Sequence, residues 1–314
     1  MDVKVRPMRE DDLEEADRIV RLAFGTFLGM PDPMQFMGDA DHVRTRYKAD
    51  PQSALIAEVD GKIVGSNFAL DWGSVGIFGP LTVHPDYWDK GVARALLDRT
   101  MKIFEGWGTK HVGLFTFAQS SKHVHLYQKY GFWPRYLTAI MSKEVGKAEN
   151  AGLEAINYSE LGADKQKEMI HECARLTGSI MEGLDLKKEI ISVQKQKLGD
   201  TILLIVGDMI SAMAICHCGP GTEAGSGTCY IKFAAVRASA DSARVFDSLL
   251  DSCERYARLE KATRLVGGVN TGRHNAYRRM IERGFRTDMQ GIAMHRPNEP
   301  GYNREDMFLI DDWR

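Results

Sequence analysis

A turn between an apolar run and a helical pattern carries the residues of this 314-residue chain best suited to bind an anion. The run Leu81-Thr82-Val83 leads into a polar stretch, and Gly91 then precedes apolar residues at helical spacing. The first turn of a helix leaves backbone N–H groups unpaired at the positive end of the helix dipole, so it favours a phosphate or pyrophosphate. A glycine there lets the backbone approach the ligand where a Cβ would collide. The sequence therefore predicts an anion site at the start of this helix.

Tyr127 is a second candidate, within the run Leu-Tyr-Gln-Lys-Tyr-Gly-Phe that ends at Phe132. Its phenol can donate a proton to a leaving group. The spacing alone fits equally well an aromatic side chain packed on a helix face. Both interpretations stay open at the level of this motif.

The elements that must position these residues follow from hydrophobic periodicity and turn signals. The Gly79-Pro80 pair interrupts the strand before the anion site, because proline has no N–H to donate and glycine tolerates a bulge. The pattern predicts strands over 3–6, 53–59, 62–70, 74–83, 110–117 and 137–142, and helices over 11–23, 41–48, 91–105 and 121–130.

The second half of the chain repeats the first. Gly131-Phe132 recurs 153 positions later as Gly284-Phe285, and the same offset aligns Leu96-Leu97-Asp98 with Leu249-Leu250-Asp251. Sparse identity in constant register indicates a divergent duplicated domain. The polar segment 143–152 is the predicted linker, so we expect domains over 1–147 and 148–314, with an inserted loop over 219–227.

The composition is that of a globular protein, with 44% apolar residues, 27% charged residues and a net charge of −2. Without a basic surplus, nucleic acid is not an expected partner. No apolar stretch approaches the roughly 20 residues of a membrane helix, and the charged N-terminus does not resemble a signal peptide. We therefore expect a cytoplasmic protein, monomeric or homodimeric, without a membrane partner.

Five cysteines and several histidines raise the question of a metal. Cys216-His217-Cys218 with Cys229 could be a zinc site, but strand alternation puts Cys216 and Cys218 on one face of an apolar run. We favour small buried or surface cysteines and expect no metal.

With Leu81–Leu97 and Leu126–Phe132, the first half resembles the GNAT superfamily of acyl-CoA-dependent N-acetyltransferases over residues 1–145. The resemblance implies an α+β fold of two tandem GNAT-like domains, each a mixed, mostly antiparallel sheet flanked by helices. It also implies acetyl-CoA as co-substrate and a small-molecule amine as acceptor. The residues implied to bind the coenzyme are Leu81, Thr82, Val83, Asp89, Lys90, Gly91, Val92, Ala93, Arg94 and Ser120.

In this family a neutral amine attacks the thioester carbonyl directly, and a proton donor serves the departing thiolate. Tyr127 occupies the family position of that donor. The base is less defined: Asp71, which ends the third strand and is expected to face the acceptor, is preferred to His84 and Glu58. A water chain could replace any single base.

This chain departs from the family pattern at three positions. Trp88 stands where Gln or Arg is usual, Asp89 where Gly is common, and Ser120 where Asn is usual. The family contact with pyrophosphate is through backbone amides, so we expect coenzyme binding to survive, with Lys90 and Arg94 offsetting the charge of Asp89.

The second copy lacks the features that carry the chemistry. At the offset of 153, Gly91 becomes Arg244, Ala93 becomes Phe246 and Tyr127 becomes Met280, which cannot donate a proton. We therefore expect one active site, in an order similar to that of N-myristoyltransferases. The tandem arrangement also resembles mycothiol synthase, in which the second copy is active.

The Met- and Phe-rich segment 24–37 lies where the family lines its acceptor pocket, although packing between the domains would explain it as well. The leading hypothesis is an acetyl-CoA-dependent N-acetyltransferase acting on a small primary amine. The alternative is a non-catalytic acyl-CoA-binding sensor or interaction module, which Trp88 and Asp89 favour and which Gly91 and Tyr127 oppose.

Overall fold

The computed structural model describes residues 1–146, 153–207 and 209–314. The first half contains β1 (Lys4–Pro7), α1 (Leu13–Phe27), α2 (His42–Ala49), β2 (Ala54–Val59), β3 (Lys62–Trp72), β4 (Val75–Phe78), β5 (Thr82–Val83), α3 (Val92–Trp107), β6 (His111–Thr116), α4 (Ser121–Gln128) and β7 (Trp133–Glu144). The second half contains β8 (Ala155–Asn157), α5 (Ala163–Ile180), α6 (Lys187–Gln196), β9 (Gly199–Val206), β10 (Met209–Gly219), β11 (Gly225–Val236), α7 (Ser242–Leu259), β12 (Arg264–Asn270), α8 (His274–Glu282), β13 (Arg286–Arg296) and β14 (Leu309–Ile310).

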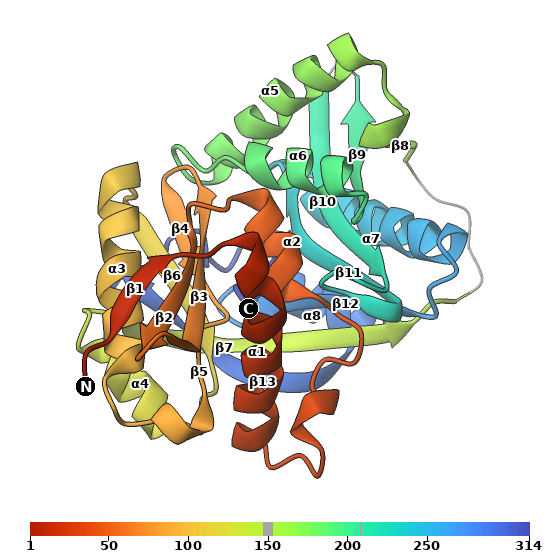
Figure 1. Cartoon of the computed structure of the whole chain (residues 1–314). Helices are drawn as coiled ribbons and strands as arrows, with labels where there is room; N and C mark the ends of the chain where they lie inside the picture. The colour runs from red at the N-terminus through yellow and green to blue at the C-terminus, as the bar shows by residue number, and fades with distance from the viewer. Residues whose placement is uncertain (147–152, 208) are drawn as a thin grey trace.

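The strands of both halves join in one sheet, in the order β1-β2-β3-β4-β6-β13-β7-β12-β11-β10-β9-β8. β13, from the second half, lies between β6 and β7 of the first, while β7 pairs with β12 (Figure 1). β7 of the first half and β13 of the second half are thus exchanged between the two halves. Among the described strands, β4–β6 and β11–β12 pair in parallel and the other pairs are antiparallel. The predicted α+β class with a mixed, mostly antiparallel sheet is confirmed.

The internal repeat appears in the structure with the predicted offset. β12, α8 and β13 each begin 153 positions after β6, α4 and β7, at Arg264, His274 and Arg286. The linker begins later than predicted, because β7 continues to Glu144 and pairs with β12 there. Residues 147–152 of the linker, and with them the predicted domain boundary, lie outside the described residues.

Amphipathic helices cover the sheet and build the core around the site. α1 buries Ala16, Ile19 and Val20, the face that its periodicity predicts, and α3 buries Leu96 and Phe104. Each fully buried large aliphatic or aromatic side chain contributes about 1.5–3 kcal/mol. Among the residues that the structure describes, no helix combines the length and hydropathy needed to cross a bilayer.

Candidate active site

β4 and β6 pair only as far as Ile77 and Gly113, and beyond them the two strands diverge. The chain after β4 stays attached to β3, since Gly79 N donates to Phe68 O at 2.9 Å and Thr82-Val83 pairs with Gly65-Ser66. Residues 79–83 therefore keep β3 on one side and leave the edge that faces β6 open. An open strand edge can accept the amides of an extended ligand.

A cavity of about 790 Å³ lies between the diverging strands, α4 and the start of α3. Nine of the predicted site residues line it together: Leu81, Thr82, Val83, Asp89, Gly91, Val92, Ala93, Arg94 and Tyr127. The predicted residues Lys90, Ser120 and Asp71 are not part of its lining. Nine of the twelve predicted site residues thus lie around one cavity, and their role in binding the coenzyme stays a prediction.

The turn before α3 has the conformation of an anion-binding loop. Gly91, with φ 86°, occupies the left-handed region that a glycine adopts without strain. Ala95 N bonds Gly91 O at 3.1 Å, so the N–H groups of Val92, Ala93 and Arg94 precede the first bond within the helix. Backbone donors at a helix start suit a pyrophosphate.

The two unusual residues of this loop have local roles. The Trp88 indole N–H donates to Val83 O at 2.7 Å, which ties the loop to the strand before it. Asp89 forms an ion pair with Lys122 at 2.7 Å, so Lys122, which the sequence did not single out, offsets this carboxylate. Ser120 serves as the N-cap of α4, where its Oγ accepts a bond from His123 N.

Tyr127 is buried and also lines the cavity. Its ring packs against Phe78, with centroids 5.9 Å apart, and burial raises the pKa of its phenol above the ordinary value. The hydroxyl therefore keeps its proton at neutral and moderately alkaline pH. Packing and proton donation, the two interpretations of this residue, are compatible in this geometry.

The three predicted bases lie away from the cavity. Asp71 pairs with Lys188 at 2.9 Å and lines a separate cavity of about 30 Å³. Glu58 pairs with Arg6, and His84 accepts a bond from Asp86 N. None of the three lines the large cavity.

His42, which the sequence analysis did not consider, does line the cavity. It is 6% exposed, and its Nδ1 is buried without a hydrogen-bond partner. Burial lowers its pKa to about 3, so the imidazole is neutral at neutral pH.

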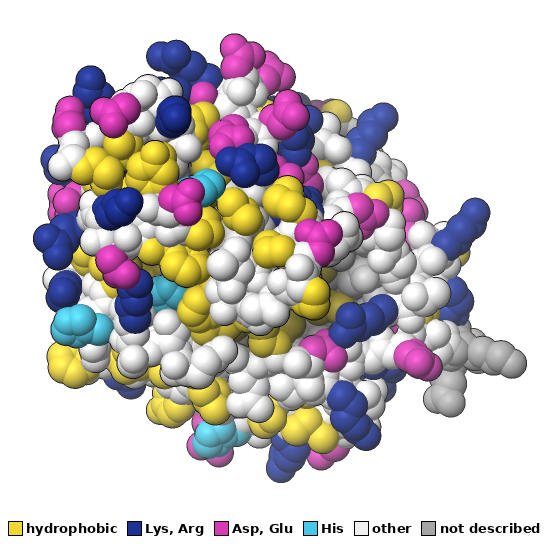
Figure 2. Space-filling model, turned by 60° about the horizontal axis from the view of Figure 1, so that its bottom comes forward, with side chains coloured by type: hydrophobic (Ala, Val, Ile, Leu, Met, Phe, Trp, Pro, Cys, Tyr) yellow, Lys and Arg dark blue, Asp and Glu magenta, His cyan; other side chains and the backbone are white. Residues whose placement is uncertain are grey.

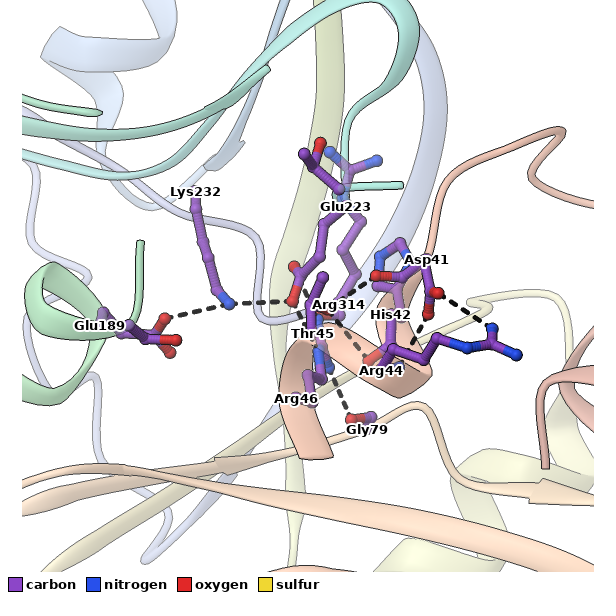
Figure 3. Close-up of polar contacts among 12 residues, drawn as sticks. Asp41, His42, Arg44, Thr45, Arg46, Gly79, Glu189, Glu223, Lys232 and Arg314 are labelled. Atoms are coloured by element: carbon purple, nitrogen blue, oxygen red, sulfur yellow. Dashed lines mark hydrogen bonds and ion pairs between the residues drawn. The ribbon is translucent and has the colours of Figure 1, made fainter. Parts of the chain in front are cut away.

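A buried ionic network joins the two halves beside the cavity (Figure 3). Arg46 on α2 pairs with Glu223 at 2.9 Å and donates to Gly79 O at 2.6 Å. Lys232 on β11 pairs with Glu223 at 2.9 Å and with Glu189 at 3.1 Å. Burial raises the pKa of Glu223, but Arg46 and Lys232 outweigh it and hold that pKa well below its usual range. The sequence analysis did not single out this network. A charged residue, Lys232, within the otherwise apolar run Tyr230–Ala235 is the feature that could have indicated it.

The corresponding groove of the second half is filled by the chain itself. β14 pairs with β11 through Ala234↔Ile310 and Ala235↔Leu309, and Val236 N donates to Phe308 O at 3.0 Å. Ala234 to Val236 are the counterparts of Leu81 to Val83. The ring of Phe246, the counterpart of Ala93, lies 5.2 Å from that of Phe308. β14 thus covers the strand edge that stays open in the first half.

Aromatic side chains form another part of the cavity lining. Phe24 stacks on Phe36 at 5.1 Å, and Phe27 lies 5.1 Å from Phe117. All four line the cavity. On the face seen in Figure 2, hydrophobic side chains gather across the middle, and charged side chains lie mainly toward the rim.

The cysteines are free thiols, with Cys216 and Cys229 buried on paired strands. In the described part of the chain, no three His, Cys, Asp or Glu residues form a group that could hold a metal ion.

Comparison with known proteins gives consistent results. Residues 20–132 match the model of the acetyltransferase (GNAT) family. Over 128 residues the chain is 29% identical to acetyltransferase SG1711 of Sodalis glossinidius, covering 40% of this chain and 84% of that protein. Over 148 residues it is 30% identical to the mycothiol acetyltransferase of Propionibacterium freudenreichii, covering 45% and 44% of the two chains.

Across the whole chain, the fold resembles a tandem GNAT protein from the clavulanic acid biosynthesis pathway. The TM-score is 0.56 at 11% identity, covering 94% of this chain and 98% of that one. This likeness supports the tandem arrangement of the fold.

Proposed function

We propose that this chain, whose residues 20–132 match the model of the acetyltransferase (GNAT) family, transfers an acetyl group from acetyl-CoA directly to a primary amine of a small molecule. One observation carries the proposal: an open strand edge, a helix start with free N–H groups and a buried tyrosine line the same cavity of about 790 Å³.

The donor side of the cavity fits coenzyme A. The edge of Leu81 to Val83 suits the amides of the pantetheine arm, and the N–H groups of Val92 to Arg94 suit the pyrophosphate. When bound, acetyl-CoA supplies the acetyl group as an activated thioester. Because Asp89 is paired with Lys122, its negative charge is offset and does not prevent binding of the diphosphate.

On this proposal, Tyr127 holds a proton at its Oη for the departing sulfur, because burial keeps the phenol protonated. His42 accepts a hydrogen bond from the neutral acceptor amine. Because its pKa is so low, the His42 imidazole does not hold the proton that the amine loses; that proton passes to water, and water returns a proton to the Tyr127 phenolate after the thiol has left. The position of Asp71, paired with Lys188, does not support its role as the base.

The test measures release of free thiol from acetyl-CoA by the purified protein over a panel of amines, with mass detection of the acetylated product. We expect amine-dependent thiol release and N-acetylated product. Tight binding of acetyl-CoA without turnover on any amine would contradict the proposal and favour an acyl-CoA-binding sensor.

A further inference from the structure

The tail of the chain runs from the filled groove of the second half into the active cavity of the first. After β14, Asp311 and Asp312 are buried, and Trp313 and Arg314 line the cavity. Figure 1 shows the C mark at the centre of the molecule, beside α1 and α2. The same segment thus fills one groove and contributes Trp313 and Arg314 to the lining of the other.

Arg314 is fixed next to the point where β4 and β6 diverge. Its carbonyl oxygen accepts a bond from Arg46 Nη2 at 2.5 Å, and Arg46 Nη1 donates to Gly79 O at 2.6 Å. Gly79 and Arg314 therefore bind to neighbouring nitrogens of one guanidinium. Figure 3 shows Arg314 beside Arg46, His42 and Glu223.

Asp312 and Tyr230 both contact the guanidinium of Arg314. Nε is buried 3.1 Å from Asp312 Oδ2, and the ring of Tyr230 lies 4.3 Å from Cζ. The side chain of Arg314 is still 26% exposed, and the residue lines the cavity. A planar fork of N–H donors at a cavity wall matches the two oxygens of a carboxylate.

Three features line the same cavity: Arg314, the buried imidazole of His42 and the aromatic side chains of Phe24, Phe27, Phe36 and Phe117. We propose that the acceptor is an amine that also carries a carboxylate, with that carboxylate bound by Arg314 and the apolar body against the aromatic wall. This inference rests on the proposed acetyl transfer and adds the class of acceptor.

The experiment compares kcat/KM for acceptors that differ only in the carboxylate: phenylalanine against phenethylamine, and 6-aminohexanoate against hexylamine. In the wild type we expect at least one carboxylate-bearing acceptor to be preferred by about tenfold to a hundredfold. In Arg314→Gln that preference falls to near one, and in Arg314→Lys, which keeps the charge but loses the fork, it is intermediate.

The matched control is Arg278→Gln, because Arg278 is exposed on α8 and pairs only loosely with Glu282. It should keep the wild-type preference. If Arg314→Gln misfolds because Asp312 is left uncompensated, the double variant Arg314→Gln/Asp312→Asn removes both charges of the pair and makes the same test.

Equal kcat/KM for both members of each pair in the wild type would overturn the inference. So would an equal loss on both members in Arg314→Gln. In either case amines are still acetylated, so the proposed function stands. If no amine is acetylated at all, the proposed function itself fails.

Discussion

The proposed role of Tyr127 as proton donor can be tested by replacing a single residue. Tyr127→Phe removes the proton donor and keeps the ring packed on Phe78, so we expect kcat to fall about 10²–10⁴-fold with acetyl-CoA affinity little changed. Since burial raises the pKa of this phenol, its ionisation should cause no loss of wild-type activity in moderately alkaline solution. The control is Tyr136→Phe, because Tyr136 is 50% exposed. Equal kcat for Tyr127→Phe and wild type would remove this hydroxyl from the mechanism.

His217 gives a prediction about acid stability. It is buried, both ring nitrogens lack partners, and burial lowers its pKa to about 4. Between about pH 6.5 and pH 4 the unfolded chain binds a proton that the folded chain does not, so stability falls as pH falls, by at most about 1.4 kcal/mol per pH unit. His217→Leu should reduce the loss of melting temperature between neutral and mildly acidic pH.

The control for this prediction is His171→Leu, since His171 is exposed on α5. It should leave the acid dependence of the melting temperature as in the wild type. The same acid dependence in His217→Leu as in the wild type would show that His217 does not titrate in this window.

At the scale of residues, the sequence could predict what a contiguous motif encodes. Leu81, Val83 and Gly91 are brought to one cavity with Tyr127 because the strand-turn-helix pattern is local. Arg46 and Glu223 could not be found in this way, because they meet only when the two halves pack together.

β14 is the element whose role the sequence did not indicate. Ile310 is fully buried in the groove of the second half, against Gly267. Ile310→Ala should lower the free energy of unfolding by about 2–5 kcal/mol, measured by urea denaturation. Because β14 leads to Trp313 and Arg314, KM for the acceptor should rise more than the Kd for acetyl-CoA. Leu259→Ala, at a 70% exposed position, is the control and should change both little.

If Ile310→Ala raised the Kd for acetyl-CoA as much as the acceptor KM, the tail would support the whole site rather than the acceptor end. The strand has only two residues, and it follows a polar stretch with two Pro and two Asn, so its pattern is too short to be identified from periodicity alone.

Most other helices and strands of the first half could be predicted from the sequence, but which strands pair with one another could not. The predicted helices over 91–105 and 121–130 correspond to α3 and α4. β7 has the same sequence pattern whether it pairs with β6 or with β12, so its exchange with β13 leaves no trace in the sequence.

For the whole molecule, the shared sheet predicts one cooperative unfolding transition. β13 is bonded to both β6 and β7, so neither half can unfold while the other keeps all its strands. Calorimetry of the intact protein should give one transition, with calorimetric and van't Hoff enthalpies in agreement. Two resolved transitions would mean that the halves are energetically separate despite the exchanged strands.

The strand exchange also fixes when, during synthesis, the enzyme can become active. A ribosome delivers the chain from its N-terminus, and the residues proposed to bind coenzyme are synthesised long before β13. Until Arg286–Arg296 arrives, one edge of β6 has no partner, and the tail that walls the cavity is absent. The cavity is therefore complete only once β13 and the segment through Arg314 have been made, so a product that stops before them would lack part of the proposed active site.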